Sequence, residues 1–258
     1  MLVDSHCHLD HFTADEQAVL IERAAAAGVT RMVTIGTHVA QAADVKAIAS
    51  RYDAVWGTVG VHPQRAGDGT MPSVEELVAL ADHPRIIGLG ESGLDYFYDK
   101  APRDVQQEGF RRHIRAARKS GLPLCIHARD ADDDIAAILA EERAGGAFAF
   151  LLHCFSSTPT LADAAVAMGG YISFSGILTF PKSQPLRDLA ARLPKDRLLV
   201  ETDSPYLAPV PIRGKRCEPA YMAHTATVLS QCRGLSQDQI AEITTENFFR
   251  LYAKAGRP

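Results

Sequence analysis

The chain has 258 residues, of which 47% are hydrophobic and 22% are charged, and its formal net charge is -4. This composition can bury a large core and excludes an extensively disordered chain. The length suits one α/β barrel and is too short for two ample domains, so we expect a single domain over residues 1–258. The acidic balance excludes a protein that holds long duplex DNA non-specifically, because such proteins neutralise phosphates with a strong basic excess.

Short apolar runs recur along the chain, and a helical stretch rich in alanine, leucine and charged residues follows each of them. Eight runs at this spacing favour a parallel sheet closed into a TIM (β/α)8 barrel, which is an α/β fold. In chain order, the predicted strands are Leu2–His8, Arg31–Gly36, Val55–His62, Ile86–Glu91, Leu122–His127, Phe148–His153, Gly170–Ser175 and Arg197–Asp203.

Several of the intervening helices have clear ends. Asp15–Ala27 is rich in alanine and stops at Gly28, a favoured C-terminal cap. Asp104–Ser120 carries apolar residues on one face at helical spacing, and a last helix is predicted over Gln237–Tyr252. Between the last strand and that helix, Ser204–Pro219 holds four prolines, which predicts an irregular loop.

The first residues and the cysteines bear on where the protein works. The sequence MLVDSHCHLD lacks the basic and apolar regions of a signal peptide. No apolar run approaches the roughly 18 residues of a membrane span, so we expect no contact with a membrane. Five cysteines without a C-x-x-C pair disfavour a disulfide framework or a cysteine-ligated zinc site. We therefore expect a protein of the reducing cytoplasm.

Residues able to bind a metal stand where five of the predicted strands end. His6 and His8 are two residues apart in the first strand, so both imidazoles point to one side and Cys7 to the other. In α/β barrels the active site lies at the carboxyl ends of the strands. We therefore predict one metal centre, whose ligands are His6, His8, Glu91, His127, His153 and Asp203.

The number and type of these donors predict the cofactor. Six donors are more than one tetrahedral ion needs, which favours two ions bridged by a carboxylate, with Glu91 as the candidate bridge. The other donors divide into His6, His8 and Asp203 for one ion, and His127 and His153 for the second. Imidazole and carboxylate suit one or two divalent ions of zinc, magnesium or manganese.

Two of the ligands are also the predicted catalytic residues. Asp203 is the candidate general base that orients a metal-activated water. Glu91 is the bridge on which both ions depend. No activated serine or cysteine nucleophile is apparent, since no spare histidine serves the serines beside the ligands.

Basic residues near the same rim are candidates for binding an anionic substrate. Guanidinium groups match phosphate oxygens in bidentate fashion, and a solvated surface loop is the alternative for each of them. A histidine in GVHP, at the end of the third strand, faces the same mouth, unless it only forms a turn before Pro63. The predicted substrate-binding residues are His62, Arg129, Arg213, Lys215 and Arg216.

Other residues near this centre are not predicted to bind the metal themselves. Asp95 and Glu201 are candidates to orient ligand imidazoles through hydrogen bonds. The aromatic run Tyr96–Tyr98 either stacks on a nucleobase or packs its loop against the core. His11 has no comparable placement, and we expect it to be structural or on the surface.

The motifs resemble those of the TatD-type metal-dependent deoxyribonucleases, a branch of the amidohydrolase-like barrels. The resemblance covers nearly the whole chain and rests on DSHCHLD, GVHP, GLGESGLDYFYD, IHARDA, LHCFSS, YISFSG, ETDSPYLAP, RGKRCEPAY and TTENFFRLY. It implies a cytosolic enzyme that hydrolyses DNA phosphodiester bonds with one or two divalent cations. The six predicted ligands match those of the family. Cys217 departs from the family, which more often has asparagine there; it lies outside the predicted metal ligands and bears only on substrate contacts.

Three functions remain open from the sequence. The first is a deoxyribonuclease acting exonucleolytically on strand ends or single strands of DNA, with no obligate protein partner. The alternative is hydrolysis of a small ester, lactone or amide at the same centre, and the basic rim favours the phosphate ester. A structural metal module is disfavoured, because ligands around a barrel mouth leave an open position.

Overall fold

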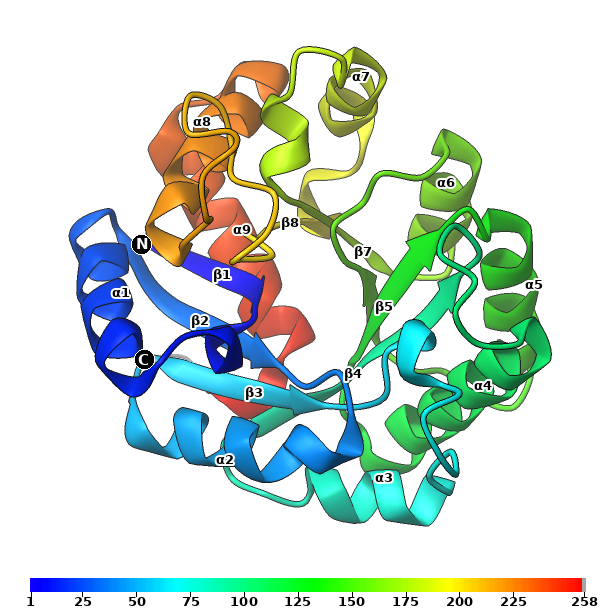
Figure 1. Cartoon of the computed structure of the whole chain (residues 1–258). Helices are drawn as coiled ribbons and strands as arrows, with labels where there is room; N and C mark the ends of the chain where they lie inside the picture. Colours follow the sequence, from blue (N-terminus) through cyan, green and yellow to red (C-terminus); the bar gives the residue numbers. More distant parts are fainter. Residues whose placement is uncertain (257–258) are drawn as a thin grey trace.

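The computed structural model describes residues 1–256, and the last two residues of the predicted domain lie outside the described part. Eight parallel strands pair in chain order, and they occupy the centre of Figure 1 with helices around them. This arrangement confirms the predicted (β/α)8 barrel. The strands are β1 Leu2–Cys7, β2 Val29–Ile35, β3 Val55–Val59, β4 Ile86–Asp95, β5 Leu124–Arg129, β6 Phe150–Leu152, β7 Tyr171–Phe174 and β8 Leu198–Val200.

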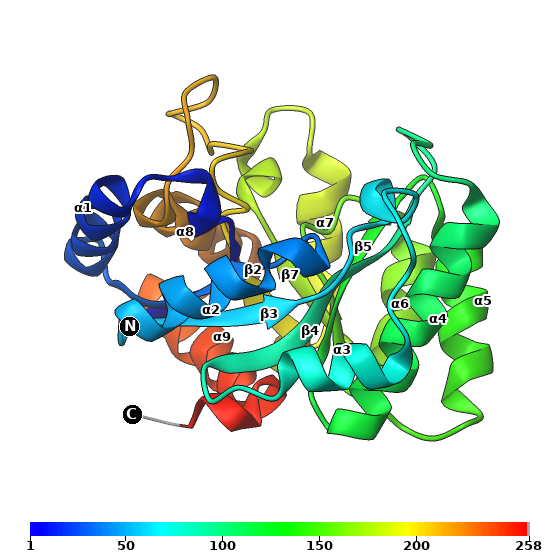
Figure 2. The ribbon, with the colours of Figure 1, turned by 60° about the horizontal axis from the view of Figure 1, so that its bottom comes forward.

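Helices cover the outer face of the strands, as Figure 2 shows from a second direction. The three helices given bounds from the sequence are confirmed to within one residue at each end, and 204–218 is irregular as predicted. Among residues 1–256, no helix combines the length and apolar character that crossing a membrane requires. The helices are α1 Ala14–Ala26, α2 Ala42–Arg51, α3 Val74–Ala81, α4 Arg103–Ser120, α5 Asp132–Arg143, α6 Pro159–Ala167, α7 Gln184–Arg192, α8 Met222–Arg233 and α9 Gln237–Leu251.

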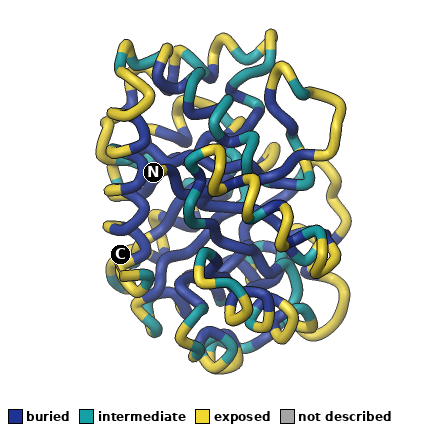
Figure 3. Tube along the Cα trace, turned by 90° about the vertical axis from the view of Figure 1, so that its left-hand side faces the viewer, coloured by how far each residue is buried: buried dark blue, intermediate teal, exposed yellow. Residues whose placement is uncertain are grey.

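The apolar core has two parts, on the two faces of the strands. The larger part packs the outer face against the helices and includes Cys7, whose outward orientation was predicted. The smaller part fills the barrel interior: every strand contributes to it, and Phe248 and Tyr252 at the end of α9 complete it. Buried residues accordingly run through the middle of the molecule in Figure 3. The interior is therefore solid at one end, which leaves the other end for polar side chains.

The barrel closes between β8 and β1 through a seam of polar contacts. Asp4 accepts hydrogen bonds from the amide and the hydroxyl of Thr202, at 2.9 and 2.6 Å. Burial raises the pKa of Asp4 to about 7, although these hydrogen bonds oppose the shift. The amide of Asp203 donates to the carbonyl of His6 at 2.9 Å. The seam therefore brings the segment after β8 next to the histidines of β1.

Strand β4 continues to Asp95, whereas the sequence predicted that it ends at Glu91, and this prediction was wrong. A register shift around Glu91 interrupts the pairing with β5, which then resumes. At Gly93 the backbone has a φ of +146°, and a Cβ atom there would overlap the carbonyl of His127. Glycine thus allows the extension of β4 to lie against β5. Glu91 stands within the strand, and its side chain faces the interior.

Candidate active site

A cavity of about 730 Å³ lies at the carboxyl ends of the strands. Five of the six predicted ligands line this cavity, and His6 lies beneath its floor with no exposed surface. β1 and the residue after it supply two histidines, β4 and β5 one ligand each, and the segments after β6 and β8 the remaining two. The fold therefore brings together all six residues, which are His6, His8, Glu91, His127, His153 and Asp203.

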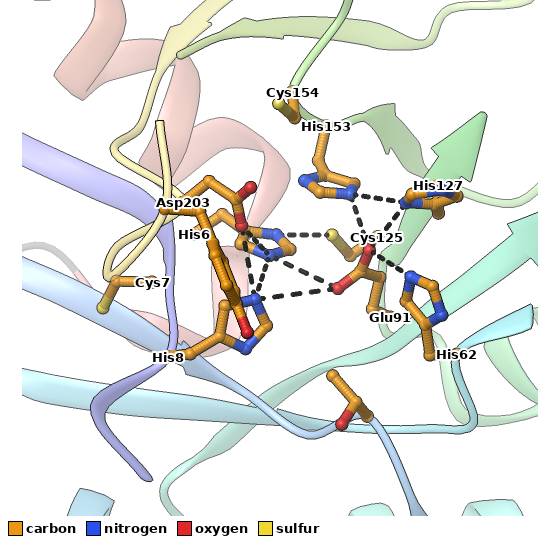
Figure 4. A network of polar contacts seen from close by, with 12 residues as sticks. His6, Cys7, His8, His62, Glu91, Cys125, His127, His153, Cys154 and Asp203 are labelled. Atoms are coloured by element: carbon orange, nitrogen blue, oxygen red, sulfur yellow. Dashed lines mark hydrogen bonds and ion pairs between the residues drawn. The ribbon is translucent and has the colours of Figure 1, made fainter. Parts of the chain in front are cut away.

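The carboxylate of Glu91 stands between two groups of side chains, as Figure 4 shows. Its Oε2 atom lies 3.4 Å from His6 Nε2 and 4.0 Å from His8 Nε2. Its Oε1 atom lies 3.0 Å from His127 Nδ1 and 2.7 Å from His153 Nε2. One oxygen thus faces each group, an arrangement that suits a carboxylate bridging two cations.

The first group, which we call the first half-site, consists of His6, His8 and Asp203. The Nε2 atoms of its two imidazoles are 3.2 Å apart, and Asp203 Oδ1 lies 3.4 and 3.3 Å from them. His6 Nδ1 lies 3.3 Å from the thiol of Cys125. When that nitrogen carries the proton of the neutral ring, the Nε2 lone pair faces the other donors. Converging lone pairs of this kind fit a divalent cation.

The second group, the second half-site, consists of His127 and His153. The facing nitrogens of the two rings, Nδ1 and Nε2, are 3.4 Å apart. Behind them stand two carboxylates: Glu201 Oε1 lies 3.2 Å from His153 Nδ1, and Asp95 Oδ2 lies 3.3 Å from His127 Nε2. Glu201 therefore makes the predicted hydrogen bond to an imidazole, whereas Asp95 only lies close to His127 Nε2, which has no hydrogen-bond partner in the described structure. Such outer carboxylates fix the tautomer and orientation of metal-binding imidazoles.

The buried charges of the cluster depend on one another. Burial alone would raise the pKa of Glu91, but the adjacent imidazoles of His153 and His62 hold it well below its usual range. For Asp203, burial is likewise outweighed by the contact with His8, and the pKa is lowered. Burial would lower the pKa of His153, yet the carboxylates of Glu91 and Glu201 raise it well above its ordinary value. The carboxylates therefore stay ionised and favour cationic partners.

His62 faces the same carboxylate but differs from the other histidines in its tautomer. Its Nδ1 accepts a hydrogen bond from the amide of Gln64 at 3.1 Å, so the proton of the neutral ring is on Nε2. Nε2 lies 3.3 Å from Glu91 Oε1. Burial lowers the pKa of His62, which favours the neutral ring. His62, Glu91 and His127 lie close enough to share an ion, but this tautomer makes His62 a hydrogen-bond donor into the cavity.

The predicted substrate-binding residues divide into two sets. His62 and Arg129 line the cavity, whereas Arg213, Lys215 and Arg216 do not. Arg216 pairs with Glu16 at 2.8 Å and stacks on the ring of Phe12 at 4.0 Å. The guanidinium of Arg213 lies 4.4 Å from the ring of Phe180.

Several residues line the cavity without having been predicted to do so, among them His11, Gln64, Lys100 and Tyr206. The sequence analysis gave His11 a structural or surface role, yet its ring lies 5.5 Å from that of His8. The signal for His11 was its place three residues after His8, the spacing of one 3-10 turn. The other three give no such signal, because each reaches the cavity from a connection outside the strands and α-helices, whose path depends on the tertiary structure. They are Gln64, Lys100 and Tyr206.

Comparison with protein families shows what the chain is related to. The model of the family described as TatD related DNase matches residues 3–253. The uncharacterized metal-dependent hydrolase YcfH of Escherichia coli K12 is 41% identical, over 97% of this chain and 95% of the relative. The uncharacterized metal-dependent hydrolase YabD of Bacillus subtilis strain 168 is 38% identical, over 98% and 99%. A relative in Cronobacter sakazakii, 34% identical over 93% and 92%, is named 3'-5' ssDNA/RNA exonuclease TatD.

Solved structures agree with these relatives. The crystal structure of YjjV, a TatD homologue from Escherichia coli K12, has a TM-score of 0.90 and 28% identity, and covers 98% of both chains. An organophosphorus hydrolase from Deinococcus radiodurans shares the fold alone, at a TM-score of 0.67 and 17% identity. Because the family model spans nearly the whole chain and close relatives cover it end to end, the chain belongs to the TatD related DNase family of metal-dependent hydrolases.

Proposed function

We propose that the protein is a divalent-metal-dependent deoxyribonuclease that cleaves DNA phosphodiester bonds exonucleolytically, at strand ends or along single strands. The observation that carries this proposal is the position of Glu91, with one carboxylate oxygen toward each half-site at the floor of an open cavity. A second support is that a relative covering most of the chain is named as a single-stranded DNA and RNA exonuclease.

Each half-site would hold one divalent ion, of zinc, magnesium or manganese. The first half-site and Glu91 would hold one ion, and the second half-site and Glu91 would hold the other. The support is the donor set itself: imidazole nitrogens and carboxylate oxygens converge within about 3 to 4 Å of one another. Bound ions of this kind supply Lewis acidity, which activates water and polarises a phosphoryl oxygen.

The side chains around the centre have separate tasks. Asp203, at the cavity wall, accepts the proton of the attacking water and orients it. His62 donates a hydrogen bond from Nε2 to a phosphate oxygen, in agreement with the tautomer set by Gln64. Arg129 contacts the phosphate with the edge of its guanidinium group. Arg213, Lys215 and Arg216 are proposed to contact more distant phosphates, because they lie outside the cavity wall.

Size and charge favour a strand end or a single strand as the substrate. The net charge of -4 provides no extended basic face for a duplex, so the substrate must be held locally. A cavity at the end of a barrel admits an unpaired strand more readily than a duplex. The cytoplasm is the proposed location, since the five cysteines are all free.

The test is the purified protein with single-stranded DNA labelled at either end, in the presence of Mg²⁺, Mn²⁺ or Zn²⁺ and after chelation. We expect stepwise shortening from one end that stops with chelator and returns with metal. The same DNA as a blunt duplex is the matched substrate control and should be cut more slowly. Rapid turnover of esters, lactones or amides without cleavage of DNA would overturn the proposal and favour the alternative activity.

A further inference from the structure

Three consecutive aromatic residues follow β4, and their surroundings differ. Tyr96 is half-buried: its hydroxyl lies 2.6 Å from Asp134 Oδ2, and it accepts a hydrogen bond from Gln107 at 2.8 Å. Phe97 and Tyr98 are 55% and 51% exposed. Packing against the core, α4 and α5 therefore explains Tyr96 alone. Large exposed aromatic rings next to a catalytic cavity require another explanation.

Phe97, Tyr98 and Arg129 form a compact cluster, which we call the aromatic platform. The two rings meet edge to face with their centroids 4.9 Å apart. The guanidinium of Arg129 lies 4.2 Å from the centroid of the Phe97 ring and 5.0 Å from that of Tyr98. Within residues 1–256 Arg129 forms no ion pair with a carboxylate. The flat face of the Arg129 guanidinium group thus packs against the rings, while its N–H groups stay available to bind an anion.

One carboxylate fixes the platform relative to the metal centre. Asp95 Oδ1 accepts hydrogen bonds from the amides of Phe97 and Tyr98, at 3.1 and 2.9 Å. The other oxygen of Asp95 lies 3.3 Å from Nε2 of His127, in the second half-site. The platform and a metal-site imidazole thus depend on the same side chain. A surface positioned in this way loses little conformational entropy when it binds a ligand.

The platform adjoins the cluster of predicted metal ligands. Tyr98 and Arg129 line the same cavity as Glu91. Arg129 is two residues beyond His127 on β5, so the two side chains point to the same side, about 6.6 Å apart along the strand. The ammonium group of Lys100, also in the cavity wall, lies 5.8 Å from the Tyr98 ring. A half-exposed aromatic ring beside two cations matches single-stranded nucleic acid, which offers flat bases joined by phosphates.

We propose that the ring of Tyr98, supported by Phe97 and Arg129, stacks on one nucleobase of a single strand whose neighbouring phosphate lies at the metal centre. The inference rests on the proposed nuclease function and adds a subsite that selects unpaired bases. A base in a duplex is stacked on its neighbours and is unavailable to the ring, so the subsite favours single strands and frayed ends.

The experiment measures kcat and KM of the metal-loaded protein on a short single-stranded oligonucleotide. Tyr98→Ala should raise KM about 10-fold with little change in kcat or in bound metal, since stacking on an aromatic residue contributes about that much per base. Tyr98→Phe, which keeps the ring, should recover most of the loss. Val19→Ala is the control, because it shortens an equally exposed apolar side chain of α1 outside the cavity.

A second arm removes the base instead of the ring. Each oligonucleotide of a series lacks one base, at a different position near the scissile bond. Tyr98→Ala should raise KM on every oligonucleotide of the series except one. At that one position the wild-type protein and the variant should have equal KM. A KM on the intact strand within twofold of wild type, or an equal effect at every abasic position, would overturn the subsite while leaving the nuclease proposal intact. Failure of the wild-type protein to cleave any strand would instead overturn the proposed function, and the subsite with it.

Discussion

The two half-sites use the same kinds of donor but neutralise their cations by different routes. In the first half-site a carboxylate, Asp203, stands directly among the imidazole nitrogens at 3.3 and 3.4 Å. In the second, the carboxylates of Asp95 and Glu201 stand behind the imidazoles at 3.3 and 3.2 Å. In the first half-site the carboxylate of Asp203 therefore faces the cation directly. In the second half-site the carboxylates of Asp95 and Glu201 act on the cation through the imidazole rings that they polarise. Glu91 alone serves both.

Within the described part of the chain, the outer ring nitrogens of the first half-site have no carboxylate partner, in contrast to those of the second half-site. His6 Nδ1 is backed by the thiol of Cys125, whose pKa burial raises well above its ordinary value. His8 Nδ1, like His127 Nε2 in the second half-site, has no hydrogen-bond partner in the described structure, but unlike His127 Nε2 it has no carboxylate within ion-pair distance. A neutral thiol polarises an imidazole far less than a carboxylate does. The second half-site should therefore depend on its outer partners, and the first on Asp203 itself.

Replacement of Glu91 should have the largest effect, because it removes the residue that the two half-sites share. Glu91→Ala should lower kcat more than about 100-fold, since loss of even an outer partner of a metal ligand costs 10–100-fold. Both bound ions should be lost or weakened, with a modest loss of folding stability. The measurements are turnover, metal content by atomic emission and thermal unfolding. Retention of full activity would refute the bridging role.

Glu218→Ala is the matched control for that variant. Glu218 is also a largely buried glutamate, but it pairs with Arg23 and lies outside the cavity. Its replacement should affect folding stability and leave turnover and metal content at wild-type levels.

The outer partners can separate the two half-sites. Glu201→Gln keeps the side-chain volume but removes the charge behind His153, and should lower the affinity for one ion by 10–100-fold. Cys125→Ser, the corresponding change behind His6, should lower metal affinity less than threefold, because no charge is lost. Titration of the metal-free proteins with Zn²⁺ gives the metal affinity of each variant and of the wild-type protein. Equal losses of metal affinity in the two variants would contradict the proposed difference between the half-sites.

Arginines beside the two half-sites should also differ in their effect on substrate binding. Arg129 lines the cavity on the side of the second half-site, so Arg129→Ala should raise KM roughly 20-fold, the cost of a charged hydrogen bond. Arg213, in the loop after β8, lies outside the cavity wall, and Arg213→Ala should raise KM by a smaller factor. An unchanged KM for Arg213→Ala would remove that residue from the phosphate contacts.

The sequence predicted the barrel and the six clustered side chains because both follow from local patterns. Strand spacing sets the topology, and the ends of parallel strands meet at one rim. The true end of β4 was not predictable, because its extension past Glu91 depends on a register shift against β5. Likewise, nothing local distinguishes Tyr96 from Tyr98: the first meets Asp134 on α5, and the second faces the cavity.

The contacts of the basic loop could not be predicted for the same reason. Arg216 has its partners, Glu16 and the carbonyl of His11, 200 and 205 residues away in the chain. The positive charges that are clustered in the sequence therefore have different surroundings. Arg216 forms an ion pair with Glu16 on α1, whereas Arg213 and Lys215 form no ion pair in the described structure. Which of these residues reaches a substrate depends on how the loop folds back, and composition alone does not specify that.

The smallest expected effect concerns His113 on α4, which supports the segment that leads to His62. Its Nε2 accepts a hydrogen bond from the amide of Val61, directly before His62, at 3.0 Å. Burial lowers the pKa of His113 to about 4 from an ordinary value of 6.5. The unfolded chain therefore binds an extra proton between pH 6.5 and 4. The stability contributed by the neutral ring is complete above pH 6.5 and declines as the pH falls toward 4.

His113→Gln keeps an acceptor for Val61 and removes this titration. Relative to the variant, the wild-type protein should lose about 1.4 kcal/mol of unfolding free energy between pH 7.5 and pH 5.5. Urea unfolding of the metal-free wild-type protein and variant at the two pH values gives the difference in their unfolding free energies. The protonation of the ligand histidines contributes equally to both proteins and cancels in this difference. A difference that does not change with pH would mean that His113 is protonated in the folded protein. The amide before His62 would then lack its acceptor, and the donor geometry proposed for His62 would lose its support.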